Sequence, residues 1–219
     1  MTSTVAPPKP PAAAKAAAGA GIALVLVAQL MIVLDAAVVN VALPRIADDL
    51  EFTPAALTWV LNGYTLAFGG LLLLGGRLGD VFGRRRMFVA GLSVFTLFSL
   101  AGGFAPTDDL LVIARALQGF GAAIAAPQVL ALLTTSAKDE AGRARAIALF
   151  SAVSSSGASI GLILGGILTD IASWRWTLFI NVPIGLVVLA LVGRLVAETA
   201  PRPGRFDIVG AVTATGGAA

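Results

Sequence analysis

The feature that most constrains this chain is a series of apolar runs, each long enough to cross a lipid bilayer as a helix. A helical span needs about 20 mostly apolar residues, and six such runs cover about residues 19–43, 56–76, 87–104, 110–134, 144–168 and 176–195. A seventh run begins near Phe206 and reaches Ala219. All of them are far longer than the roughly 10-residue alternating strands of a membrane barrel. The sequence therefore predicts an all-α transmembrane fold.

The segments around these runs set the predicted domain limits. Residues 1–17 are mostly Ala, Pro and Lys, a composition that cannot bury a core, and they predict a disordered cytoplasmic tail. A cleaved signal peptide is the alternative, but the first run is longer than the roughly 7–15 apolar residues of a signal-peptide core. We expect a six-helix bundle over 18–195, a cytoplasmic linker over 196–205 and the truncated start of a seventh helix over 206–219.

Composition excludes several kinds of chemistry. Charged residues make up only 12% of the chain, about half of the roughly 25% that a soluble domain carries, so much of the surface must face lipid. The sequence contains no Cys and no His, which removes disulfides, thiolate metal sites and imidazole acid–base chemistry. It also lacks the phosphate-binding pattern Gly-x-x-x-x-Gly-Lys-(Ser/Thr). We therefore expect no enzyme activity, no metal site and no bound cofactor.

The charges between the runs predict the orientation in the membrane. With the N-terminus inside, 12 of the 15 basic residues lie in the tail, in the second–third and fourth–fifth links, or after the sixth run. The opposite links are acidic, with Asp48, Asp49, Glu51, Asp108, Asp109 and Asp170. Because cytoplasmic loops carry the basic excess, we expect a multi-pass protein of the plasma or inner membrane with a cytoplasmic N-terminus. No basic face is interleaved with stacking aromatics, so nucleic acid is not an expected partner.

Two ionisable residues lie well inside the apolar runs. Asp35 is in the first run and Arg115 is in the fourth, where an isolated charge costs about 2.5–3.5 kcal/mol on insertion scales. At 1.5 Å per helical residue they lie about 12 Å and about 7–8 Å from the outer ends of their runs, so the two side chains can meet. Two interpretations stay open: a static pair that locks two helices, and a carboxylate that takes and releases a proton beside a guanidinium.

Glycines mark two further segments. The second–third link carries an acid within a basic, glycine-rich stretch, which favours a structural latch over a passive basic loop; its candidate residues are Gly76, Gly79, Asp80, Gly83 and Arg84. The Asp80 carboxylate could bind the N-terminus of an adjacent helix, where a negative charge is favoured. In the fifth run, glycines spaced by four form a smooth face that lets helix backbones approach closely; the segment contains Gly157, Gly161, Gly165 and Gly166.

These motifs resemble those of the major facilitator superfamily. The second–third link resembles its signature Gly-x-Leu-Gly-Asp-(Arg/Lys)-x-Gly-Arg-(Arg/Lys), with Val81 in place of a basic residue. The stretch from Leu34 to Pro44 resembles the first-helix motif of the fourteen-span drug:proton antiporter branch. The stretch that starts at Arg115 resembles the fourth-helix motif, and the fifth run resembles the antiporter motif with Leu162 in place of its Pro. The resemblance covers about residues 20–219.

The resemblance implies a function and a set of partners. It implies the N-terminal half of a transporter in which two six-helix bundles alternate access to a central site. The branch exports hydrophobic, often cationic, small molecules in exchange for protons, so the expected energy source is a proton gradient. The expected partners are the lipid bilayer, such a small molecule and the C-terminal half of the transporter. A facilitator for one metabolite and a non-transporting membrane scaffold are the alternatives. Candidate cavity-lining residues are Asn40, Asn62, Tyr64 and Gln118.

Overall fold

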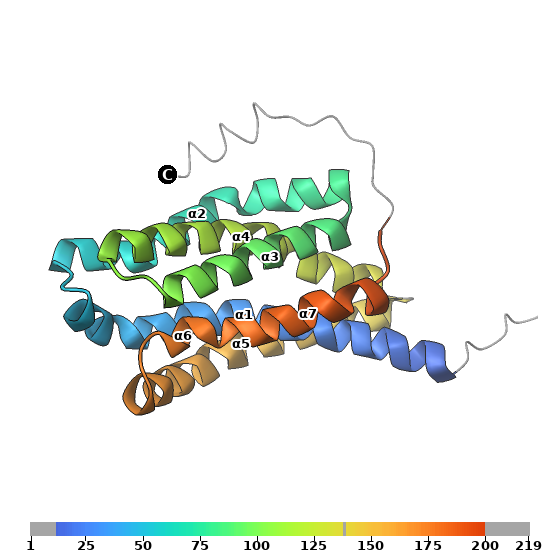
Figure 1. The fold of residues 1–219 in the computed structure, drawn as a ribbon. Coiled ribbons are helices and arrows are strands. Elements are labelled where there is room, and N and C mark those ends of the chain that lie inside the picture. The colour runs from blue at the N-terminus through green and yellow to red at the C-terminus, as the bar shows by residue number, and fades with distance from the viewer. Residues whose placement is uncertain (1–11, 138, 200–219) are drawn as a thin grey trace, which may run out of the picture.

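The protein is described by a computed structural model that covers residues 12–137 and 139–199 and consists of helices joined by short links (Figure 1). Within these residues the helices are α1 (Ala12–Asp49), α2 (Pro54–Phe82), α3 (Arg84–Gly103), α4 (Asp108–Thr135), α5 (Glu140–Ile171), α6 (Trp176–Phe179) and α7 (Asn181–Leu195). Six stretches of this part of the chain are long and apolar enough to cross a membrane, with α6 and α7 together forming the sixth. The predicted all-α transmembrane fold is confirmed.

The helices run side by side in two groups (Figure 1). In one group α4 packs against both α2 and α3, and in the other α1 packs against α5 and α7. The groups meet through contacts between α3 and α7 and between α1 and α4. Buried side chains from α1, α3, α4 and α7 fill the space between them; they include Met31, Phe95, Val129 and Val188. The charged pair predicted in the first and fourth spans therefore belongs to helices from different groups.

The links lie at the two ends of the bundle. The α2–α3 turn, the α4–α5 link and the end of α7 lie at one end, while the α1–α2 and α3–α4 links lie at the other (Figure 1). Polar residues start the helices at these links: Thr53, Thr107 and Asp139 each accept a hydrogen bond from the backbone N–H three residues further on. Such caps satisfy N–H groups that lack a partner within the helix. The basic α2–α3 turn and the acidic links thus occupy opposite ends of the bundle.

Two predicted boundaries differ from the structure. α2 continues through the predicted second–third link as far as Phe82, and α3 begins at Arg84, so that link is almost entirely helical. Gly83 is the single residue between the two helices, and its φ of 100° is a backbone conformation that residues with a Cβ rarely adopt. Among the glycines of the link, Gly83 forms the turn, whereas Gly76 and Gly79 lie within α2.

The ends of the chain are described in part. α1 begins at Ala12, inside the segment predicted as a tail over 1–17, and residues 1–11 lie outside the described residues. Of the predicted linker over 196–205, the described residues 196–199 are not helical. The predicted start of a seventh helix over 206–219 lies outside the described residues.

The glycine face of α5 packs against α1. A Cβ placed at Gly157 would lie 3.0 Å from Val33 Cγ1, and one at Gly161 would lie 2.7 Å from Ala37 Cβ. Gly165 is equally close to the backbone of α1, whereas a Cβ at Gly166 would meet nothing within 4 Å. Three of the four predicted glycines thus hold α5 tightly against the helix that carries Asp35.

The sixth span is interrupted in its first half. α6 ends at Phe179 and α7 begins at Asn181, with Ile180 between them. Pro183 follows two residues later, and because proline has no N–H it cannot donate to the carbonyl of Phe179 four residues earlier. The interruption places Asn181 at the start of a helix in the interior of the bundle, where its side chain is buried.

Candidate functional site

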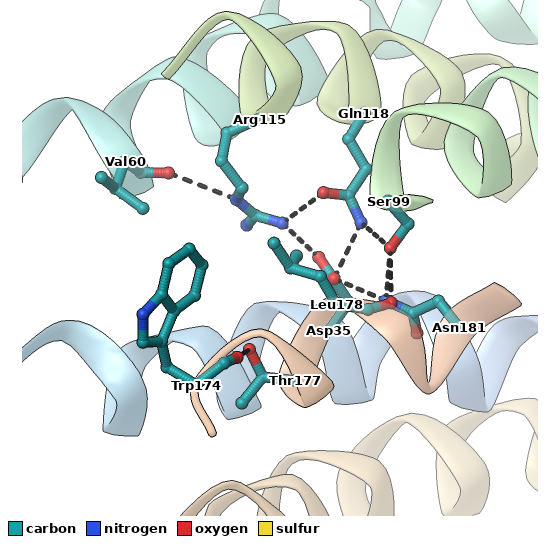
Figure 2. Close-up of polar contacts among 9 residues, drawn as sticks. All are labelled: Asp35, Val60, Ser99, Arg115, Gln118, Trp174, Thr177, Leu178 and Asn181. Atoms are coloured by element: carbon teal, nitrogen blue, oxygen red, sulfur yellow. Dashed lines mark hydrogen bonds and ion pairs between the residues drawn. The ribbon is translucent and has the colours of Figure 1, made fainter. Parts of the chain in front are cut away.

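The buried ion pair lies at the centre of a polar network between α1 and α4. Arg115 Nη1 donates to Asp35 Oδ2 over 2.6 Å, and neither side chain has any solvent exposure (Figure 2). The contact is the one that the similar depths of the two residues predict. Because an unpaired charge inside an apolar bundle is strongly unfavourable, each of these groups depends on the other for its burial.

Three more polar residues complete the network around the carboxylate. Gln118 Nε2 and Asn181 Nδ2 each donate to Asp35 Oδ1 over 2.8 Å. The same two amide groups donate to Ser99 Oγ over 3.0 and 2.9 Å, and Ser99 in turn donates to the carbonyl of Leu178 (Figure 2). The carboxylate therefore accepts hydrogen bonds from three donors on α4 and α7, and Ser99 of α3 ties those donors to α6.

The guanidinium of Arg115 makes several contacts besides the ion pair. Its Nη1 also donates to Gln118 Oε1 over 2.7 Å, and its Nε donates to the carbonyl of Val60 over 3.3 Å. Its carbon Cζ lies 4.3 Å from the centre of the Tyr64 ring, a distance typical of a cation–π contact. No described residue accepts a hydrogen bond from Nη2. Arg115 thus bridges the carboxylate on α1 and the backbone of α2.

A cavity of about 510 Å³ lies next to this network, between α1, α2, α4 and α5. Its walls are mostly apolar, and its polar lining residues are Gln29, Asn40, Tyr64, Thr65 and Arg115. Arg115 forms part of the wall although its side chain is fully buried, so the guanidinium lies directly beneath the cavity surface. Asp35 does not line the cavity, whereas its ion-pair partner Arg115 and Tyr64, which contacts the guanidinium, both do.

The predicted lining residues divide into two pairs. Asn40 and Tyr64 line the cavity. Gln118 does not, because its amide is fully buried and bonded to Asp35 and Ser99. Asn62 is exposed and is not among the residues that line this cavity. The lining role of Asn62 and Gln118 in the complete transporter stays a prediction.

A second cavity of about 630 Å³ continues toward the other end of α2. The two cavities share Gln29, Phe68 and Ala126 in their walls. Gln29 is buried; its Nε2 donates to Ser154 Oγ over 3.0 Å, while no described residue donates to its Oε1. The second cavity ends at Gly76, Arg77 and Asp80, which are residues of the predicted latch segment and its immediate neighbour.

The latch segment joins α2 to both α4 and α3. Gly79 packs against the side chain of Gln128, whose Nε2 donates to the carbonyl of Gly75 over 2.7 Å. Asp80 Oδ1 accepts a hydrogen bond from Arg84 Nη2 over 3.1 Å. The expectation that Asp80 binds a helix N-terminus is wrong, because Asp80 lies in the last turn of α2 and its carboxylate reaches the Arg84 side chain one turn later.

Glu198, in the segment after α7, occupies that helix N-terminus instead. Its carboxylate accepts hydrogen bonds from the backbone N–H groups of Arg85 and Arg86 over 3.0 and 3.2 Å. Its Oε2 also lies 3.6 Å from Arg85 Nε. A carboxylate at this position satisfies free N–H groups and interacts favourably with the helix dipole. Glu198 therefore fastens the post-bundle segment to the α2–α3 turn.

Sequence reasoning missed Ser99, Asn181 and Glu198. Ser99 and Asn181 are uncharged, so their presence in an apolar run gives a much weaker signal than a charged residue does. Asn181 was identifiable only as a polar residue two positions before Pro183. Glu198 is the acid in a segment otherwise marked by basic residues, which was the available signal for its role.

The fold and the site define a multi-pass α-helical membrane protein with an ion pair buried beneath a largely apolar cavity. Residues 25–215 match the family model described as Major Facilitator Superfamily. The chain belongs to this superfamily, which is a family of transporters and not of enzymes.

Known proteins agree with this assignment. The chain is 50% identical over 193 residues to the cephamycin export protein CmcT of Amycolatopsis lactamdurans, covering 87% of the chain and 40% of that protein. It is 47% identical to the puromycin resistance protein pur8 of Streptomyces alboniger, covering 90% of the chain and 39% of that protein. The predicted resemblance to drug exporters of the superfamily is confirmed. The chain spans about 40% of the length of these relatives.

A solved structure shares the fold. The crystal structure of a peptide transporter POT in complex with sulfate matches with a TM-score of 0.74 at 14% sequence identity. The match covers 90% of this chain and 44% of the transporter. At this identity the likeness establishes the fold only, and the described bundle corresponds to about half of that solved chain.

Proposed function

We propose that the complete protein containing this chain exports hydrophobic drug-like molecules in exchange for protons. In this proposal the chain supplies the N-terminal bundle, and a second bundle forms the opposite wall of the central site. Two observations support the proposal: the names of the relatives, which include export and resistance proteins, and the share of those relatives that the chain spans. In this proposal the second bundle covers the cavity between α1, α2, α4 and α5.

The single observation that carries the proton exchange is the ion pair of Asp35 and Arg115 beneath this cavity. In the proposed cycle, the Asp35 carboxylate takes a proton from the outer side and becomes a neutral carboxyl group. This step ends its ion pair with Arg115 and leaves the guanidinium with its other acceptors. The proton leaves on the inner side, and the ion pair forms again. Buried carboxylates that change charge in this way are typical of proton-driven transporters.

The cavity supports a preference for apolar molecules. Its wall is mostly hydrophobic, and a few polar groups from Gln29, Asn40 and Thr65 are available to orient a molecule. Sites of this kind bind many compounds of suitable size, because burial of apolar surface contributes most of the affinity. A volume of about 510 Å³ on one wall is within the usual range for drug-sized ligands.

The proposal places the N-terminus in the cytoplasm. The α2–α3 turn with its arginines lies at one end of the bundle, and the acidic links lie at the other (Figure 1). Because cytoplasmic loops carry the basic excess, the latch segment would face the cytoplasm, and the cavity beside Asn40 would lie toward the outside.

The proposal is tested by changing Asp35→Asn in the complete protein. Cells that express this variant should lose resistance to the compounds that the wild type exports, and vesicles should lose proton release on addition of ethidium, a hydrophobic cation. Asp170→Asn is the matched control, because the Asp170 side chain is 75% exposed at the end of α5; it should keep both activities. Both variants are compared at equal amounts in the membrane. Wild-type export by the Asp35→Asn variant would overturn the proposal.

A further inference from the structure

Among the described residues of α7, Asn181 has the side chain that hydrogen-bonds to Asp35, the carboxylate proposed to exchange the proton. Asn181 is the first residue of α7 and is 1% exposed. Its Nδ2 donates both to Asp35 Oδ1 and to Ser99 Oγ, over 2.8 and 2.9 Å (Figure 2). Both hydrogen atoms of the amide are therefore used within the network, and one of them binds the carboxylate.

The position of Asn181 follows from the break in the sixth span. Pro183 cannot donate to the carbonyl of Phe179, so the helical hydrogen bonds are interrupted at this point. One residue before Phe179, the carbonyl of Leu178 accepts a hydrogen bond from Ser99 Oγ over 3.0 Å. Backbone interruptions within a membrane are tolerated where polar groups of the protein satisfy them. The same network thus holds Asp35 and the junction between α6 and α7.

The hydrogen bonds of this network depend on the charge of Asp35. An ionised carboxylate only accepts hydrogen bonds, and here it accepts from Arg115, Gln118 and Asn181. When a proton binds to Oδ1, that oxygen becomes a donor, and it can no longer accept from two amide groups at once. Among the described residues, the charged or titratable side chains beside Asp35 are Arg115 from α4 and Tyr64 from α2, which stacks on the guanidinium. Neither comes from α7.

We propose that Asn181 is a positioning residue for proton exchange: its amide favours the ionised, enclosed state of Asp35, and its release upon protonation loosens the junction between α6 and α7. This inference rests on the proposed function, because it concerns the carboxylate that is proposed to carry the proton. According to this inference, α7 as well as α4 responds to protonation of Asp35. Protonation weakens the contact of α1 with α4 through Arg115 and, in the same step, the contact of α1 with α7 through Asn181.

The test measures protonation of Asp35 separately from transport. Dicyclohexylcarbodiimide reacts with protonated carboxyl groups in apolar surroundings, so its attachment to Asp35 can be followed by mass spectrometry as a function of pH in the purified complete protein. Removing a donor to the ionised form favours the protonated form. In Asn181→Leu, labelling of Asp35 should therefore extend to more alkaline pH than in the wild type, because one donor to the ionised carboxylate is lost.

A matched control separates this effect from general damage. Gln128 is also a buried amide, but it donates to the carbonyls of Gly75 and Ile124 and does not touch Asp35. Gln128→Met should leave the midpoint of labelling unchanged, whatever its effect on stability. If Asn181→Leu does not fold, Asn181→Ser also withdraws the amide from Asp35 with a smaller change of shape, and its midpoint should move in the same direction.

The outcomes distinguish this inference from the proposed function. Superimposable labelling curves for wild type and Asn181 variants would overturn the role of Asn181, as would labelling of Asp35 that does not change with pH. Proton release by the wild type upon addition of ethidium is measured in parallel. If that release is absent while the labelling midpoint still shifts, the positioning role of Asn181 stands and the exchange of drug for proton is refuted.

Discussion

Replacing Arg115 with Leu should destabilise the bundle more than replacing Asp35 with Asn. Arg115→Leu removes the 2.6 Å ion pair and the hydrogen bond to the carbonyl of Val60. It leaves the Asp35 carboxylate buried with only the two amide donors of Gln118 and Asn181. Asp35→Asn instead keeps a neutral acceptor at nearly the same place, and the guanidinium retains Gln118 Oε1, Val60 O and the ring of Tyr64.

The structure sets the size of this difference. Removing one partner of a buried ion pair costs about 3–5 kcal/mol, because the other charge remains buried without compensation. Asp35→Asn leaves the guanidinium as the charge without a partner, but the guanidinium keeps two hydrogen-bond acceptors and the Tyr64 ring, so this variant should fall at the lower end of that range, about 3 kcal/mol. In the double variant the buried charges disappear together, so its destabilisation should be smaller than the sum of the two single changes by about 1–3 kcal/mol.

The assay is thermal unfolding of the complete protein in detergent, followed by tryptophan fluorescence. A change of 1 kcal/mol shifts the Tm by roughly 2–4 °C for a domain of 150–250 residues, so Arg115→Leu should lower the Tm by several degrees more than Asp35→Asn. The double variant should unfold at a higher temperature than Arg115→Leu. Equal Tm values for Arg115→Leu and the wild type would refute the reasoning, because they would show that an unpaired carboxylate is tolerated at this position.

Two further predictions concern helix packing and the α2–α3 turn. Gly161→Leu should lower both the Tm and export, because its Cβ would meet Ala37 and force α5 away from α1. The control is Gly166→Leu, where a Cβ meets nothing within 4 Å. It should have little effect in the same two assays. Glu198→Ala should destabilise the start of α3 by about 1 kcal/mol, seen as faster amide hydrogen exchange at Arg85 and Arg86 in mass spectrometry. Unchanged exchange there would show that Glu198 is not needed as a cap.

The sequence predicted the spanning helices, which are the parts of the fold that the lipid bilayer requires. Runs of about 20 apolar residues have few alternatives to spanning helices, since every backbone polar group in the bilayer must be paired. The same cost of burial singled out Asp35 and Arg115, and their similar depths allowed a contact between them. The structure shows the ion pair, and it shows that Arg115 and Tyr64 line the cavity whereas Asp35 does not.

Other parts of the site could not be predicted because their signals are weak or depend on distant residues. Asn181 is 146 residues from Asp35 in the sequence, and an amide in an apolar run is common enough to pass without notice. The surroundings of Asn62 and Gln118 could not be predicted, because a span is recognised by its length, which does not determine which way a given side chain faces. The helical part of the α2–α3 link was missed because its glycines suggested a loop, whereas Gly79 is required by the close approach of Gln128.

The carboxylate of Glu198 attaches the segment after α7 to the α2–α3 turn. Thr199 donates its backbone N–H to the same carboxylate over 3.1 Å, so the attachment lies at the last described residues. Asp80 and Arg84 are bonded to each other across the same turn. One turn of the backbone thus connects the segment after α7 with Asp80, a residue in the wall of the second cavity.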